Sequence, residues 1–131
     1  MDGESLMKLH GKSVFLSGPM SGLLHYNVED FAKAHAIVKK AGAARVYNPA
    51  IEYLQSTAKS HDHEYWMRRC LHELTVETVS FSFGDDEVKT KGSYDVLVLL
   101  PGWMGSAGSQ LEYTVATACG IEVCELGEVE A

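Results

Sequence analysis

One stretch of the chain, YDVLVLLPGWMGSAGSQLE at residues 94–112, constrains the fold most strongly. Its five consecutive apolar residues, 96–100, predict a strand covered on both faces, because a half-exposed strand would alternate apolar and polar positions. A Pro-Gly pair ends the strand, and we expect a helix to begin near Ser109. A strand, a glycine-rich loop and a helix N-terminus in this order form the part of an open α/β sheet where ligands bind.

The remaining pattern predicts one α/β domain. Further strands are expected at 13–17, 44–47 and 121–126, and further helices after Asn27, which we interpret as an N-cap, and after Asp62. This order implies a mostly parallel sheet with helices on both faces. We interpret residues 76–93 as an excursion, for which a hairpin is one form. Residues 1–12 are expected to be a loose leader and residues 127–131 a frayed acidic tail.

The composition limits the class of protein to which the chain can belong and the kinds of partner that it can bind. A chain of 131 residues is long enough for a single core, and its net charge of −7 argues against binding to a nucleic-acid polymer. The sequence has no apolar run of about 20 residues and no signal-peptide pattern, so we expect no membrane partner. Three cysteines without CxxC spacing indicate free thiols and a cytoplasmic location.

The loop after the first strand, SGPMSG at 17–22, is the first candidate for ligand binding. Its glycines allow successive N–H groups to converge on an anion, and its two serines add hydroxyl groups. The alternative is a tight strand-to-helix turn of the kind that any α/β protein needs. The loop matches neither the phosphate-binding P-loop nor the GxGxxG dinucleotide motif.

The second candidate is the loop that follows the central strand. Its three glycines, Gly108 among them, let the backbone approach a ligand, and Ser106 and Ser109 can cap the helix or donate to a phosphate. Trp103 offers a flat face for a base or sugar. We expect Glu112 in the first turn of the helix, where it is either a partner of the helix dipole or a reactive group. Two such loops at the carboxyl ends of parallel strands can form one crevice.

Neither metal nor cofactor chemistry is favoured by the remaining polar residues. His61, His63 and Glu64 lack a familiar metal-ligand spacing, and a polar helix start explains them equally well. Arg68 and Arg69 are typical of a solvated helix face, with contact to an anionic ligand as the alternative. We therefore expect no metal and no cofactor.

Three blocks of the sequence carry a resemblance to a known family. The segments SVFLSGPMSG, YNP and DVLVLLPGWMGSAGSQLEYTVATACGIEV, in this order between about 13 and 124, resemble the nucleoside 2-deoxyribosyltransferase-like superfamily, most closely its small bacterial and phage branch. The resemblance implies a flavodoxin-like or Rossmann-like sheet and a homodimer or homotetramer. It also implies cleavage or transfer at the N-glycosidic bond of (deoxy)nucleosides or their 5′-monophosphates, without a cofactor.

The resemblance also implies roles for single residues. The spacing from Ser106 through Gly108 to Glu112 fits the family motif in which the Glu is the nucleophile. Relatives carry an Asp near the base where this chain has Cys70, and Asp85 or Asp86 is a candidate replacement acid. The substrate-binding candidates are Ser17, Gly18, Met20, Ser21, Gly22, Tyr26, Cys70, Trp103, Ser106, Gly108 and Ser109. The alternative function is a nucleotide-binding or sensor module of the same fold without catalysis.

Overall fold

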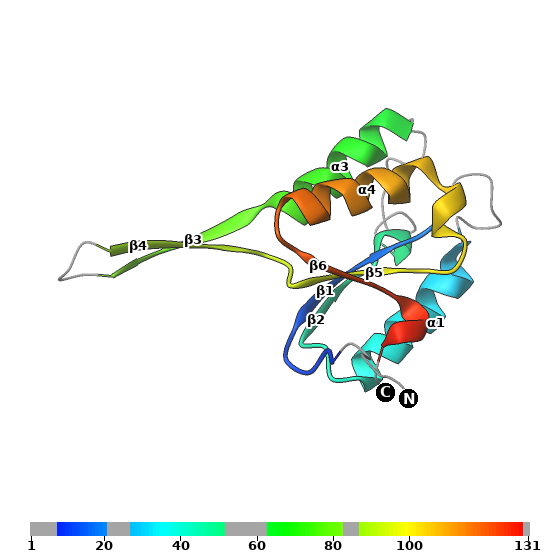
Figure 1. Cartoon of the computed structure of the whole chain (residues 1–131), viewed down its shortest axis with the longest axis horizontal. Helices are drawn as coiled ribbons and strands as arrows, with labels where there is room; N and C mark the ends of the chain where they lie inside the picture. The colour runs from blue at the N-terminus through cyan, green and yellow to red at the C-terminus, as the bar shows by residue number, and fades with distance from the viewer. Residues whose placement is uncertain (1–7, 21–26, 52–62, 83–86, 130–131) are drawn as a thin grey trace.

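The fold is built on a four-stranded parallel sheet (Figure 1). The computed structural model describes residues 8–20, 27–51, 63–82 and 87–129. The strands in spatial order are β2 (Arg45–Tyr47), β1 (Ser13–Ser17), β5 (Val96–Leu99) and β6 (Glu122–Glu125). All three strand pairs are parallel. The predicted α/β class, a single mostly parallel sheet of the flavodoxin-like or Rossmann-like type, is therefore confirmed.

Helices cover both faces of this sheet (Figure 1). α1 (Val28–Lys40) packs on one face, and α3 (His63–Thr75) and α4 (Ala107–Ala118) pack on the other. Successive strand residues point to opposite faces, which produces two apolar clusters. The cluster under α1 includes Val14, Leu16, Val96, Val98, Phe31, Ala34 and Val38, and the cluster under α3 and α4 includes Phe15, Leu97, Leu99, Cys70, Leu74 and Ala116. The four residues of β5 are all buried, as the unbroken apolar run predicted.

The strand order places a topological switch point between β1 and β5. From β1 the chain moves outward to β2 through α1, whereas the later connections through α3 and α4 run in the opposite direction along the sheet. The segments that leave β1 and β5 therefore depart to opposite faces. In open α/β sheets, ligands bind at the carboxyl ends of the strands at such a point. Here those ends are Ser17 and Leu99, which lie opposite each other in the β1–β5 register.

The excursion predicted at 76–93 is a hairpin. β3 (Glu77–Ser82) and β4 (Glu87–Gly92) pair antiparallel and form a two-stranded sheet of their own. The hairpin extends away from the central sheet and its helices (Figure 1). Its base is closed by the backbone N–H of Ser93, which donates to the carbonyl of Val76 at 3.1 Å.

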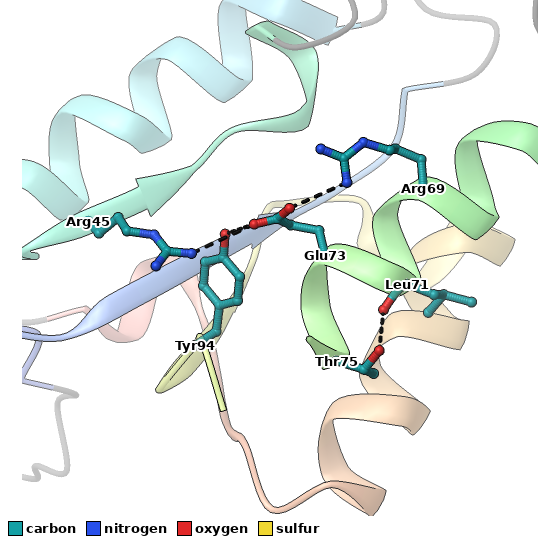
Figure 2. A network of polar contacts seen from close by, with 6 residues as sticks. All are labelled: Arg45, Arg69, Leu71, Glu73, Thr75 and Tyr94. Atoms are coloured by element: carbon teal, nitrogen blue, oxygen red, sulfur yellow. Dashed lines mark hydrogen bonds and ion pairs between the residues drawn. The ribbon is translucent and has the colours of Figure 1, made fainter. Parts of the chain in front are cut away.

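A polar network at the amino-terminal ends of the strands, which we call the amino edge, holds the base of this hairpin (Figure 2). We call Arg45, Arg69, Glu73 and Tyr94 the amino-edge network. The Glu73 carboxylate accepts a hydrogen bond from the Tyr94 hydroxyl and forms ion pairs with Arg69 at 3.3 Å and Arg45 at 3.7 Å. The Arg45 guanidinium also lies 4.5 Å from the centre of the Tyr94 ring, a cation–π contact. The network therefore joins the end of α3 to the starts of β2 and β5.

Both ends of the described chain pack more tightly than expected. Leu9 lies in the segment predicted as a loose leader, yet it is fully buried in the cluster under α1. The predicted frayed tail contains a short 3-10 helix, η3 (Leu126–Glu128), and the buried Val129. The expectation of loose ends is thus wrong for residues 8–12 and 127–129, because each segment supplies an apolar side chain to the core.

Asn27 precedes α1 as predicted but does not cap it with its side chain. Its backbone is left-handed, with φ of 64°, and its side-chain Nδ2 donates to the carbonyl of Pro19 at 2.9 Å. Asparagine tolerates this conformation better than most residues. The side chain therefore ties the start of α1 to the segment that leaves β1, instead of satisfying an N–H of the helix.

Candidate functional site

Ser17 occupies the carboxyl end of β1 beside the switch point. Because side chains alternate along a strand, Ser17 faces the same side as Phe15, toward α3 and α4. Its side chain is 1% exposed. The backbone is fixed on the β5 side, since the N–H of Leu100 donates to the carbonyl of Ser17 at 2.8 Å. A hydroxyl group is thus held rigidly where the sheet meets α4.

The facing groups come from α4. Ser109 and Glu112 are three residues apart, so they lie on one side of the helix, and both are buried at 2% and 7% exposure. The Ser17 Oγ lies 2.5 Å from Glu112 Oε1 and 3.1 Å from Ser109 Oγ. We call Ser17, Ser109 and Glu112 the buried carboxyl site. It joins two segments that are more than 90 residues apart in the sequence.

The start of α4 differs from the prediction and changes the position of Glu112. The helix begins at Ala107, with Ser106 as its N-cap, and the Ser106 hydroxyl accepts a hydrogen bond from the N–H of Ser109 at 3.2 Å. The first turn contains no acidic residue. The expectation that Glu112 lies in the first turn is therefore wrong: it lies in the second turn, where the helix dipole acts more weakly.

Burial controls the charge state of Glu112. Removal of the carboxyl from water raises its pKa from an ordinary value of 4.5 to about 7, and the hydrogen bond from Ser17 opposes part of this rise. The N-terminal end of a helix favours an ionised carboxylate, but desolvation outweighs every other influence that the described residues exert on Glu112. The pKa of Glu112 thus lies well above that of an ordinary carboxyl group, a condition associated with functional carboxyl groups more often than with structural ones.

Two of the candidate glycines are explained by close packing. A Cβ at Gly18 would lie 2.8 Å from the Cβ of Leu100, and a Cβ at Gly108 would lie 3.0 Å from the Sδ of Met67. Gly18 thus permits the contact between the segment after β1 and the end of β5. Gly108 permits the contact between α3 and the first turn of α4. Both glycines bring together the elements that surround the buried carboxyl site.

Three further candidates have partners outside the buried carboxyl site. The Trp103 ring stacks on Tyr113 with a centroid distance of 5.3 Å, so one of its faces is already covered. Met20 packs against the cluster under α1. Cys70 is buried in the cluster under α3 and α4, on the same side of the sheet as Ser17.

Several predicted residues lie outside the described part of the chain. These are Ser21, Gly22 and Tyr26 from the first loop, His61, and the candidate acids Asp85 and Asp86. The roles predicted for the three loop residues and for the two candidate acids stay predictions. Within residues 8–20, 27–51, 63–82 and 87–129, no group of three or more His, Cys, Asp or Glu side chains has an arrangement suited to a metal ion. The same part of the chain contains no helix with the length and apolar character required to cross a membrane.

Sequence reasoning missed two contacts near the site. Met67 lies against Gly108, and Tyr113 stacks on Trp103. Met67 was visible as part of an apolar helix face, but periodicity does not identify which helix faces it. Tyr113 directly follows Glu112 on α4, and nothing in the local pattern connects it to a residue ten positions earlier.

A comparison with protein families gives a match over most of the chain. The family model described as "Domain of unknown function (DUF4406)" matches residues 12–80 and 85–125. The matched residues include the central sheet, α1, α3 and α4, and all of the buried carboxyl site. Comparisons with curated proteins and with solved structures find no match.

Proposed function

We propose that this chain, which belongs to the DUF4406 family, cleaves or transfers the N-glycosidic bond of a (deoxy)nucleoside or its 5′-monophosphate, with Glu112 as the nucleophile. The family description names no activity, so the proposal rests on the site and on the sequence resemblance. The motif from Ser106 to Glu112 resembles the nucleophile motif of the nucleoside 2-deoxyribosyltransferase-like superfamily.

The observation that carries the proposal is a carboxyl group buried at the switch point of a parallel sheet. Glu112 is 7% exposed, and a hydroxyl group from the neighbouring strand contacts it at 2.5 Å. Burying a carboxylate without a cation is costly, so such groups concentrate at sites where reactivity is needed. The position at the carboxyl ends of β1 and β5 is the usual ligand position in this class of fold.

The proposed reaction proceeds in two displacements. A Glu112 oxygen bonds to the anomeric carbon of the sugar while the bond from that carbon to the base nitrogen breaks, and the base leaves with the electron pair and acquires a proton. Water, or a second base, then attacks the same carbon and releases Glu112 as a carboxylate. This is the logic of retaining glycoside hydrolysis.

The reaction requires the ionised form of Glu112. Because its pKa is about 7, we expect the rate to rise with pH through the neutral range and to level off above it. This pH dependence distinguishes Glu112 from an ordinary surface carboxylate, which is ionised at all pH values above about 5.

A second function, nucleotide binding without cleavage, is favoured by one observation. Cys70, which occupies the sequence position of an Asp in the family it resembles, is buried among apolar side chains. A thiol is a weak acid for protonating a leaving base. A binding module of the same fold needs no such acid.

The deciding experiment incubates the protein with the common deoxynucleosides, ribonucleosides and their 5′-monophosphates and measures released base by chromatography. We expect release from at least one substrate, and a loss of about 10³-fold or more in Glu112→Gln. Glu73→Gln is the matched control, because it changes a carboxyl in the amino-edge network and should retain activity. Release undiminished in Glu112→Gln, or no release from any substrate, contradicts the proposal. Thermal stabilisation by a nucleotide that stays intact supports the binding module.

A further inference from the structure

We propose that Ser17 is the positioning residue of Glu112: its hydroxyl holds Oε1 and leaves Oε2 as the oxygen that reacts. The sequence placed Ser17 among the groups that contact the substrate. The structure gives it a different role, because its Oγ is 2.5 Å from Glu112 Oε1 and its side chain is 1% exposed. The consequence for catalysis rests on the proposed function, whereas the hydrogen bond itself is testable without any substrate.

The two serines of the site form a hydrogen-bond chain whose direction depends on the charge of Glu112. A hydroxyl has one proton to donate and can also accept. When Glu112 is ionised, Ser17 donates to Oε1 and accepts from Ser109, whose Oγ is 3.1 Å away. When Glu112 is protonated, the carboxyl can donate to Ser17, and Ser17 can donate to Ser109. Both charge states are therefore satisfied without movement of any heavy atom.

Ser17 is well suited to fix a reactive group because the backbone beneath it is held by β5. It pairs with Leu99 in the parallel register, and the N–H of Leu100 donates to its carbonyl. Functional groups supported by strands are placed more precisely than those on loops. Ser106 does not share this role, since its hydroxyl serves as the N-cap of α4.

No other charged group competes with Ser17 for Glu112 in the described part of the chain. Among residues 64–75 of α3, the charged side chains are exposed, as in Glu64 and Arg68, or belong to the amino-edge network, as in Glu73. The other titratable side chains in this range are the partly buried Tyr65, the buried Cys70 and the exposed His72. On β6, Glu122 and Glu125 are exposed. β5 and η2 (Trp103–Gly105) contain no ionisable side chain. Burial and the Ser17 hydroxyl are thus the two influences on the pKa of Glu112.

The test is a pH titration of the Glu112 carboxyl carbon by NMR in protein labelled with ¹³C-glutamate, with Glu112→Gln identifying the signal. Removing the donor in Ser17→Ala should raise the apparent pKa by about one pH unit, because hydrogen bonds stabilise the ionised form. Ser17→Thr keeps the hydroxyl and should restore the original midpoint. Ser109→Ala leaves the direct donor in place, so we expect a smaller shift. An unchanged midpoint in Ser17→Ala overturns the proposal.

Activity measurements on the same variants separate positioning from substrate binding. For a positioning role, Ser17→Ala lowers kcat and moves the acid limb of the pH profile to higher pH, while KM stays the same. A raised KM with an unchanged kcat would make Ser17 a substrate ligand and overturn the proposal. If no substrate is cleaved, the proposed function fails, and the titration still decides whether Ser17 positions Glu112. If Ser17→Thr does not fold, Ser17→Cys, a weaker donor of similar shape, should give an intermediate midpoint.

Discussion

Two carboxyl groups of this chain, Glu112 and Glu73, lie near opposite ends of the strands of the same sheet. They differ in how their negative charge is compensated. Glu112 at the carboxyl edge is surrounded by apolar side chains and hydroxyl groups, and no cation faces it within the described residues. Glu73 at the amino edge contacts two guanidinium groups and a phenol (Figure 2). Each accepts a hydrogen bond from a hydroxyl, so the difference between them lies in charge compensation.

This difference indicates what each carboxyl contributes. Glu73 holds three elements together, and the guanidinium groups of Arg45 and Arg69 match its charge. Glu112 connects two elements, β1 and α4, through Ser17, but its ionised form is destabilised by burial. A carboxyl group that destabilises the folded state when charged is found more often at functional sites than at structural ones. The comparison therefore predicts opposite effects on stability when each charge is removed.

The largest effect is expected from Glu112→Gln, which should stabilise the protein at alkaline pH. In the folded protein the pKa of Glu112 is raised to about 7, so the protonated carboxyl contributes stability that is fully present below pH 4.5 and is lost as the pH rises through 7. The difference corresponds to roughly 3 kcal/mol above pH 8. Glutamine keeps the shape and never ionises, so it avoids this loss.

Thermal unfolding of both proteins at pH 4.5 and at pH 8.5 tests this prediction. We expect similar Tm values at the lower pH and a Tm higher by roughly 10 °C for Glu112→Gln at the higher pH. Glu122→Gln, an exposed carboxyl on β6, is the matched control and should show no such pH-dependent gain. Equal Tm values at both pH values would mean that Glu112 carries no uncompensated charge.

The second prediction is a change in stability of the opposite sign. Glu73→Gln should destabilise the protein by about 1–2 kcal/mol, because it removes the charge that Arg45 and Arg69 share and weakens the acceptor for Tyr94. The loss should shrink in 1 M salt, since these groups are partly exposed and screened. Urea unfolding at low and high salt measures it. If Glu73→Gln were more stable than the parent protein, Glu73 and Glu112 would not differ in the way their charge affects stability.

The sequence was sufficient for much of the fold and for naming Glu112 as a candidate site residue. The unbroken apolar run at 96–100 identified the central strand, and glycine-rich loops after two strands indicated the edge where a ligand site forms. The spacing that singled out Glu112 is that of the family motif the chain resembles, and its residues lie close together in the sequence. Such local patterns can be read directly because neighbouring residues share one helix or one strand.

Contacts between distant segments were not predictable. The pairing of Ser17 with Glu112 depends on the strand order, and no local pattern reports which strand lies beside which helix. The elevated pKa of Glu112 was missed for the same reason, since burial depends on how α4 packs on the sheet. The amino-edge network shows only one local signal, the Arg69–Glu73 spacing of four residues.

The smallest effect concerns the phenol that completes the amino-edge network. Tyr94→Phe should cost about 1 kcal/mol at neutral pH, because it removes the hydrogen bond to Glu73 and keeps the ring contacts with Phe15 and Arg45. Burial, followed by the hydrogen bond to Glu73, raises the pKa of Tyr94 from 10.0 to about 12. The protonated phenol thus contributes stability that is complete below pH 10 and lost as the pH rises through 12.

Absorbance at 295 nm follows this titration directly. One of the six tyrosines should ionise near pH 12 in the parent protein, and that late step should be absent in Tyr94→Phe. In Glu73→Gln the same step should move to lower pH, because the neighbouring negative charge is gone. A late step that persists in Tyr94→Phe would belong to another tyrosine. The raised pKa could then not be assigned to the Tyr94 hydroxyl beside Glu73.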